Sequence, residues 1–287
     1  MKNLFLSAIA TMFLVFSGTT QAQTKSLKLE NSLLWKISGN GLAKPSYLYG
    51  TFHMICAKDY FLSEKTKKAF DVSDKVVFEV NLSDPNEMEY AMKMGMGEQP
   101  LSKTLSTEEL SKLDEVLKKN AGVNVQQVDA LSLAGVMGLI TMKSFGCTDI
   151  KMYEVEFMEA AKKKNLPMGG LETAKSQEKT ASNAYSNLEM IAMLNESTLE
   201  GSEKSIADYK KEDLQALYNY HTRAEVMNAK AKKYMLDDRN INWVKQMPEM
   251  MKKESVFFAV GAAHLGGELG VINLLRQEGY KVEQVTK

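Results

Sequence analysis

Two of the three histidines in the chain occupy the same kind of position. His53 ends the motif Gly50-Thr-Phe-His, and His264 ends the motif Gly261-Ala-Ala-His. Each motif follows an apolar run typical of a buried strand, so both histidines are expected at carboxyl ends of strands, where open α/β sheets bind ligands. A single histidine at a strand end is more often an ordinary satisfied polar residue. The repetition favours one site built from both.

Charged residues at three other places are candidates for the same site. Glu79 interrupts the apolar strand Lys75–Val80, and a carboxylate in such a place needs a partner. Glu172 ends a short predicted strand, although an acid at a helix N-terminus explains it equally well. Arg239 and Asn240 precede a helix, and spacing alone favours a capped helix start with solvated charges. These four residues stay candidates for catalysis.

Two mechanisms suit these residues. In the first, His53, His264 and Glu79 bind a divalent metal that lowers the pKa of a bound water and polarises a carbonyl, which suits hydrolysis of an amide or ester. In the second, no metal is present. One histidine is then the general base, Glu79 orients it, and Arg239 stabilises the oxyanion. The composition of the chain does not choose between them.

The apolar pattern predicts the elements that position these side chains. We expect an α/β domain with a central mixed sheet and flanking helices. It has two related halves, each running strand, Gly-x-x-His, helix, strand, and a helical insertion over about residues 86–250. The elements expected in the two halves are the strands Tyr47–Tyr49, Lys75–Val80, Val256–Val260 and Lys281–Val285, and the helices Ser63–Phe70 and Gly267–Gln277.

The first 22 residues have the features of a secretory signal peptide. Lys2 precedes an apolar run from Leu4 to Phe16, and Ala22 ends a small-residue cleavage signal. The mature chain, residues 23–287, is therefore expected to be one exported domain, periplasmic or extracellular, with no transmembrane segment. The chain has 36 basic and 36 acidic residues without a basic cluster, which argues against nucleic acid as a partner.

Taken together, these motifs resemble those of the TraB/GumN family, which also includes the TIKI proteins. The resemblance rests on both Gly-x-x-His motifs, on Glu79, on the segment Gly170–Thr173 and on the pair Arg239-Asn240, and it covers nearly the whole mature chain. It implies a fold similar to that of erythromycin esterase and the haem-binding ChaN proteins. Glu172, Arg239 and Asn240 match family motif positions.

The resemblance also implies a function. TIKI members are described as metal-dependent proteases with paired Gly-x-x-His motifs and an essential acid. Carried over, this makes His53, His264 and Glu79 the ligands of manganese, cobalt or zinc in a hydrolase, with a peptide or a small ester or amide as substrate. The alternatives are a non-catalytic protein that binds haem or another small molecule, and a metal-independent esterase.

The two cysteines, Cys56 and Cys147, are most simply explained as one disulfide in an exported chain. Such a bridge would tie the segment after His53 to the helical insertion. The alternative is that Cys56, three residues after His53, is itself a metal ligand, which would leave Cys147 unpaired in an oxidising compartment.

Overall fold

The structure, a computed structural model, describes residues 29–286. Its centre is a six-stranded sheet in the order β6-β4-β7-β2-β1-β8. β1 runs antiparallel to both of its neighbours, and the other strands are parallel to one another, so the sheet is mixed as predicted. The strands are β1 (Leu34–Ser38), β2 (Ser46–Thr51), β4 (Lys75–Val80), β6 (Met168–Glu172), β7 (Val256–Gly261) and β8 (Lys281–Gln284).

The strands β2 and β7 lie next to each other in the middle of the sheet. They are parallel, with Gly50 opposite Val260 and Thr51 opposite Gly261. This register brings their carboxyl ends to the same edge, one residue out of step, so the two Gly-x-x-His turns leave the sheet side by side. Gly50 permits that approach, because a Cβ on it would lie 3.1 Å from both the Cα and the Cβ of Ala262.

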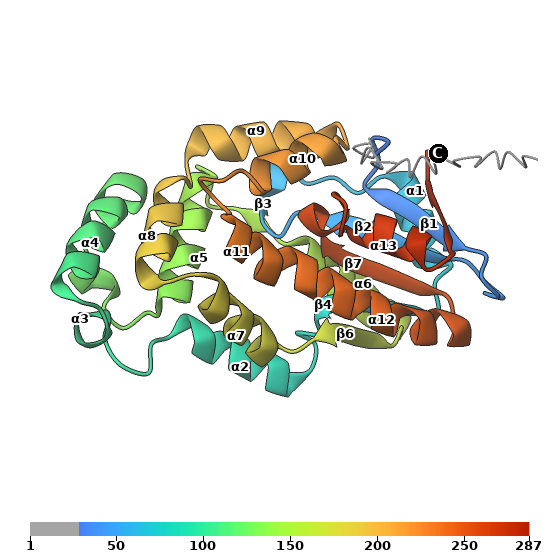
Figure 1. The fold of residues 1–287 in the computed structure, drawn as a ribbon, viewed down its shortest axis with the longest axis horizontal. Coiled ribbons are helices and arrows are strands. Elements are labelled where there is room, and N and C mark those ends of the chain that lie inside the picture. The colour runs from blue at the N-terminus through green and yellow to red at the C-terminus, as the bar shows by residue number, and fades with distance from the viewer. Residues whose placement is uncertain (1–28, 287) are drawn as a thin grey trace, which may run out of the picture.

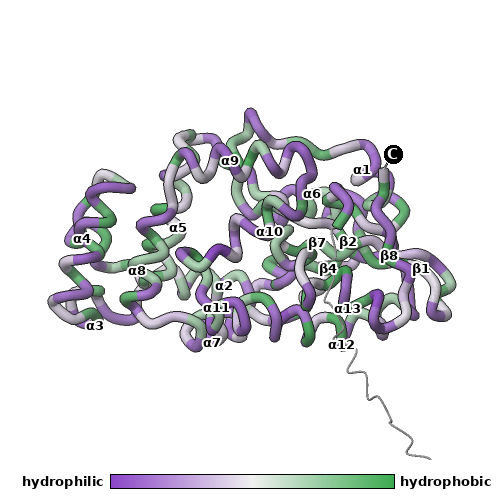
Figure 2. The backbone as a smooth tube through the Cα atoms, turned by 45° about the horizontal axis from the view of Figure 1, so that its top comes forward, coloured by the Kyte–Doolittle hydropathy of each residue, from purple (hydrophilic) through white to green (hydrophobic). Residues whose placement is uncertain are grey.

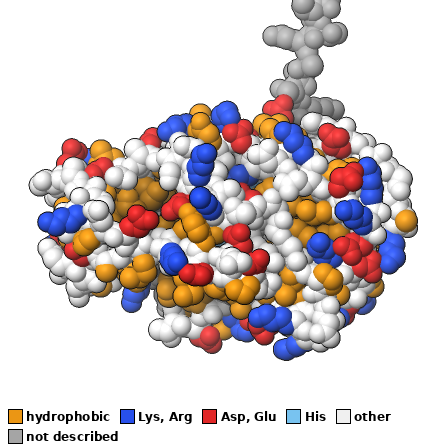
Figure 3. Space-filling model, turned by 90° about the horizontal axis from the view of Figure 1, so that it is seen from below, with side chains coloured by type: hydrophobic (Ala, Val, Ile, Leu, Met, Phe, Trp, Pro, Cys, Tyr) orange, Lys and Arg blue, Asp and Glu red, His pale blue; other side chains and the backbone are white. Residues whose placement is uncertain are grey.

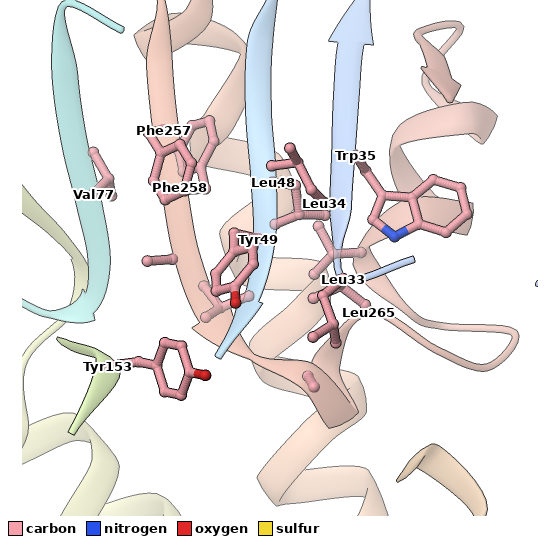
Figure 4. Close-up of a cluster of buried hydrophobic side chains, with 14 of the residues drawn as sticks. Leu33, Leu34, Trp35, Leu48, Tyr49, Val77, Tyr153, Phe257, Phe258 and Leu265 are labelled. Carbon is pink, nitrogen blue, oxygen red and sulfur yellow. The ribbon is translucent and has the colours of Figure 1, made fainter. Parts of the chain in front are cut away.

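The hydrophobic core lies on both faces of the sheet. Every residue of β7 is buried, as expected for a central strand covered by helices on each side. On one face Phe257 packs against Tyr49 of β2, with ring centroids 6.0 Å apart (Figure 4). Phe70 and Phe157, from the helices that cover this face, reach the same ring. Apolar residues follow these strands in Figure 2.

The helices fall into two groups. α12 and α13 lie in front of the sheet in Figure 1, and α2 to α5, α7 and α8 extend away from it. The helices are α1 (Glu64–Asp71), α2 (Pro85–Gly95), α3 (Leu101–Thr104), α4 (Thr107–Ala121), α5 (Leu133–Ser144), α6 (Tyr153–Lys164), α7 (Ala174–Ala184), α8 (Asn187–Asn195), α9 (Leu199–Lys210), α10 (Leu214–His221), α11 (Ala229–Lys232), α12 (Asp238–Lys253) and α13 (Val271–Gln277).

The extended helices have a hydrophobic cluster of their own. Leu113 and Leu117 of α4 pack there with Val136 and Ile140 of α5. α4 begins at a capping box, in which the Ser106 hydroxyl accepts a hydrogen bond from the Glu109 amide and the Glu109 carboxylate accepts one from the Ser106 amide. This part of the chain therefore keeps its shape by packing that is separate from the sheet.

Two expectations about the arrangement are not confirmed. The two related halves are not confirmed, because β4 pairs with β7 whereas β8 pairs with β1 at the opposite edge. The strand β6 lies within the range 86–250 and belongs to the central sheet. The likeness to erythromycin esterase and ChaN stays a prediction.

The predicted disulfide between Cys56 and Cys147 is present. It joins two short paired strands, β3 (Ile55–Cys56) and β5 (Ile150–Lys151), to the end of α5. Cys56 is thus not available as a metal ligand, which settles the alternative reading of this residue.

The outer surface carries mixed charges. On the face drawn in Figure 3, acidic and basic side chains are interspersed with hydrophobic ones. Within residues 29–286, no helix is long and apolar enough to span a bilayer. The predicted signal peptide, residues 1–22, lies outside the described residues, so export stays a prediction.

Candidate active site

His53 lies in the turn after β2 and is held by an acid from α6. Its Nδ1 is 2.8 Å from Oε1 of Glu154, and the Thr51 hydroxyl donates to the same oxygen at 2.6 Å. Because a carboxylate accepts hydrogen bonds, Nδ1 carries a hydrogen. Nε2 faces Oε1 of Glu79 at 4.0 Å. The His53 side chain is 58% exposed, so it forms the open side of the site.

His264 is the buried counterpart, at the end of the single helical turn after β7. Asn240 fixes its tautomer. The Asn240 amide nitrogen donates to the carbonyls of Leu269 and His264, so its Oδ1 is free to accept from Nδ1 of His264, 2.6 Å away. Nε2 of His264 is therefore the unprotonated nitrogen that carries the lone pair. It lies 3.8 Å from Oε1 of Glu79.

Glu79 lies between the two histidines at the carboxyl end of β4. Its Oε1 accepts the backbone N–H of Gly261 at 2.8 Å. Its Oε2 accepts from Arg239 at 2.5 Å and from the side-chain amide of Gln177 at 3.1 Å. Gly261 has no room for a side chain, because a Cβ would lie 3.2 Å from Nε2 of His53 and 3.3 Å from Oε1 of Glu79.

Arg239, in the first turn of α12, is buried and uses its whole guanidinium in this cluster. Nε and Nη2 donate to Oε1 of Glu172 at 2.9 and 2.6 Å, and Nη2 also donates to Glu79. Nη1 donates to the Met235 carbonyl at 2.9 Å and to Nε2 of His264 at 3.1 Å. A guanidinium has five N–H donors, so none is left for a substrate.

The pKa values in this cluster follow from burial and from the neighbouring charges. Glu154, helped by Glu79, raises the pKa of His53 to about 9. Burial lowers the pKa of His264 to about 3, and the charge of Arg239 acts in the same direction. Burial alone would raise the pKa of Glu79, but Arg239 and the histidines hold it well below its usual range. At neutral pH His264 is thus neutral and Glu79 is ionised.

Formal charges show what the cluster lacks. Three carboxylates, those of Glu79, Glu154 and Glu172, face the guanidinium of Arg239 and the imidazole of His53. Because the pKa of His53 is about 9, this ring is mainly protonated at neutral pH, and one negative charge is left without a partner. Oε2 of Glu154 is also buried without a hydrogen-bond partner among the described residues. Buried charges are normally paired or bound to metal. A divalent cation that replaced the proton on Nε2 of His53 would balance the two negative charges that then remain.

The donor atoms also suit a metal, although they are not closed around one. Within residues 29–286, no group of three His, Cys, Asp or Glu side chains is placed to hold a metal ion as it stands. Nε2 of His53 and of His264 lie 4.0 and 3.8 Å from Oε1 of Glu79. Ligand atoms around one first-row metal at about 2.1 Å are roughly 3.0–3.4 Å apart. Small side-chain rotations, and release of Arg239 from His264, would close that difference.

The residues selected from the sequence lie together. His53 and His264 both approach one oxygen of Glu79, so their Nε2 atoms are at most about 8 Å apart. Every candidate belongs to one connected network of hydrogen bonds and ion pairs: His53, Glu79, Glu172, Arg239, Asn240 and His264.

One local interpretation is wrong. Arg239 and Asn240 were interpreted as a solvated helix start, but they are 8% and 1% exposed and point into the site. Only the neighbouring Asp238 fits that interpretation, since it pairs with Lys233 at the surface. Glu172 is not explained as a helix-capping acid either. Thr173 caps α7, and Glu172 pairs with Arg239.

Sequence reasoning missed Glu154, Thr51 and Gln177. Glu154 stands in the first turn of α6, where an acid is ordinary because it complements the helix dipole. Thr51 lies inside the first motif, and its role could be suspected only from its place beside His53. Gln177 carries no signal in the sequence that distinguishes it from other helical amides.

The fold and the cluster define a class: an α/β protein with two histidines and three carboxylates at the carboxyl edge of a mixed sheet. The model of the TraB/PrgY/gumN family matches residues 33–284, and the chain belongs to that family. No solved structure is a significant match.

Curated relatives are distant and share one kind of name. The zebrafish (Danio rerio) protein named metalloprotease TIKI2 is 23% identical over 323 residues, which covers 90% of this chain and 62% of that protein. Zebrafish metalloprotease TIKI1 is 24% identical, covering 88% of this chain and 63% of that protein. Metalloprotease TIKI1 of Xenopus tropicalis is 23% identical, and the match covers 98% of this chain and 68% of that protein. The chain thus spans somewhat less than two thirds of the length of the zebrafish relatives.

Proposed function

We propose that this protein is a metal-dependent hydrolase that cleaves peptide bonds, with His53, Glu79 and His264 as the metal ligands. One observation carries the proposal. Both imidazoles are anchored through Nδ1, by Glu154 and by Asn240, and both turn Nε2 toward the same oxygen of Glu79. Metal-binding histidines typically have this second hydrogen bond, which fixes the tautomer and the ring.

The chain's own residues have distinct parts in this proposal. Glu154 and Asn240 hold the protons on Nδ1 of the two histidines, so both Nε2 atoms can act as ligands. Arg239 keeps Glu79 ionised and in place, while Gly261 holds the other carboxylate oxygen through its N–H. When bound, the metal would supply Lewis acid chemistry toward a peptide carbonyl and a water.

The metal-free mechanism has less support. It requires Arg239 to stabilise an oxyanion, and all five N–H donors of Arg239 are engaged within the protein. It also requires a histidine base. Glu154 raises the pKa of His53 to about 9, so this side chain is mainly protonated near pH 7 without a metal, whereas burial lowers the pKa of His264 to about 3, which makes it a weak base whose Nε2 already accepts from Arg239. Solvent around the exposed ring screens part of this effect and leaves its direction unchanged.

The test is metal analysis together with cleavage of a peptide library by the mature protein, residues 23–287. The protein is stripped with a chelator and then titrated with Mn²⁺, Co²⁺ or Zn²⁺, with binding followed by calorimetry. We expect one ion per chain and cleavage that depends on it. The variants His53→Ala and Glu79→Gln should each lose binding and cleavage. The control Glu108→Gln makes the same change at an exposed residue and should keep both.

The possible results distinguish the metal-dependent hydrolase from its alternatives. Cleavage that survives chelation and both variants refutes the proposal. Cleavage that survives chelation but is lost in both variants favours the metal-independent hydrolase. A purified protein with a haem absorption band, and without cleavage, favours the ligand-binding protein.

A further inference from the structure

A cavity of about 400 Å³ opens beside the two histidines and extends under the helices that follow in the chain. His53 and His264 line one end of it. The rest is formed by α5, α9 and α10, by the end of α8 and by the segment 196–198 that follows it. Its volume falls within the range of about 300–1,000 Å³ that is usual for small-molecule and side-chain pockets.

The wall of the cavity is apolar and adaptable. Leu194, Leu217 and Phe145 are buried residues of the wall, and Met137 and Met193 lie beside them. Methionine side chains are unbranched and flexible, so such a wall adapts to apolar groups of different shape. The cavity therefore selects ligands by their size and apolar character rather than by one exact shape.

Several lining residues carry polar side chains, but apolar atoms form most of the surface that faces the cavity. The hydroxyls of Ser144 and Ser202 bond to each other at 2.9 Å. Ser205 lines the cavity, is 3% exposed, and has no hydrogen-bond partner for its Oγ among the described residues. Among the described residues, this wall has no buried charge to pair with a charged ligand. Its charged members, Glu196 and Arg223, are partly exposed and lie near each other.

We propose that this cavity is the specificity pocket for the peptide substrate, and that it binds a large apolar side chain adjacent to the bond held at His53 and His264. This inference rests on the proposed function. The cavity is continuous with the histidine site, so a peptide bond placed there puts a neighbouring side chain into the apolar wall. Phe, Leu, Met and Tyr suit it, whereas Asp, Glu and Lys would bury an unpaired charge.

Two independent readouts test the pocket. In the first, saturation-transfer NMR measures binding of the N-acetyl amides of Phe, Leu, Ala and Glu to the metal-stripped mature protein. In the second, a positional peptide library measures cleavage by the metal-loaded protein. We expect binding in the order Phe and Leu, then Ala, then Glu, and a cleavage preference of at least about tenfold for a large apolar residue over Ala at one position.

Variants locate the preference in the cavity. Ser205→Leu narrows the cavity from α9, and Thr141→Phe narrows it from α5. Each should reduce the binding of the Phe amide at least about fivefold, in keeping with the cost of excluding a few methylene-sized groups. Ser205→Ala should keep the binding, because it removes only an unpaired hydroxyl. The control Ser111→Leu makes the same change on the exposed face of α4 and should have no effect.

The outcomes separate this proposal from the previous one. Binding of the Phe amide that is lost in the folded Ser205→Leu and Thr141→Phe variants supports the pocket, even if no peptide is cleaved. Equal binding and equal cleavage for Phe, Ala and Glu overturn the pocket, even if the protein proves to be a metal-dependent peptidase. Binding that survives both narrowing variants overturns it as well. Thermal melts establish that each variant is folded.

Discussion

Replacing Arg239 by Met tests whether the site is built around its guanidinium. The substitution keeps most of the side-chain volume and removes the charge that pairs with Glu79 and Glu172. Both carboxylates are at most 11% exposed in their side chains, so they would remain buried without a counter-charge. Removing one partner of a buried ion pair typically costs about 3–5 kcal/mol. Gln177 still donates to both carboxylates, which places the expected loss toward the lower end.

The loss is measured as the change in the free energy of unfolding, from urea titrations of the mature protein at pH 7. A double variant makes the test specific. Arg239→Met with Glu172→Gln leaves one uncompensated carboxylate instead of two, and we expect it to be about 1–3 kcal/mol more stable than Arg239→Met alone. The reasoning would be refuted if the two losses simply added, or if Arg239→Met cost less than about 1 kcal/mol.

The pH dependence of that loss has a definite sign. Because Arg239 lowers the pKa of Glu79 in the folded state, the stability gained from their pairing is fully present above the unfolded pKa of about 4.3 and is lost as the pH falls below it. The difference between the wild type and Arg239→Met should therefore be largest near pH 7 and shrink in acid. A difference that grew in acid would contradict the ion-pair explanation.

Three further predictions concern other parts of the molecule. Cys56→Ser with Cys147→Ser opens a bridge between residues separated by 91 positions, so the free energy of unfolding should fall by roughly 4–5 kcal/mol relative to the oxidised protein; equal urea midpoints would disprove this. Burial lowers the pKa of His221 to about 4, so the folded protein should lose stability as the pH falls from about 6.5 to 4, and His221→Gln should flatten that dependence in urea titrations; an unchanged slope would count against it. Gly50→Ala places a Cβ 3.1 Å from the Ala262 backbone and should cost about 1–3 kcal/mol by calorimetry, whereas a neutral effect would show that the two turns are not in close contact.

Most of the site could be predicted from local pattern. The strand signal before each Gly-x-x-His motif was sufficient to place His53 and His264 at strand ends, and an acid inside an apolar strand was sufficient to single out Glu79. What brings them together is the pairing of β2 with β7, which local sequence does not encode. The family resemblance indicated in advance that the two Gly-x-x-His motifs belong to one site.

The rest of the site depends on contacts between distant segments. Glu154 looks like any acid in a first helical turn, and only the packing of α6 beside β2 makes it the partner of His53. From the sequence, Arg239 looks like a solvated residue. Its burial depends on the two carboxylates, Glu79 and Glu172, that the ends of two strands place beside it, and local sequence does not show that placement. The cavity has no sequence signal, since its wall is assembled from several helices whose apolar residues would suit any core.

The position of β7 has a consequence for how the molecule forms. This strand, Val256–Gly261, comes long after β2 and β4 in the chain, yet it lies between them and pairs with both. Until it emerges, β2 and β4 each present an unpaired edge, which is an open template for another chain. The sheet and the histidine site can therefore be completed only after the chain has been made as far as β7. The parallel pairing over such long separations makes this step slow, and the unfinished protein is then most exposed to aggregation.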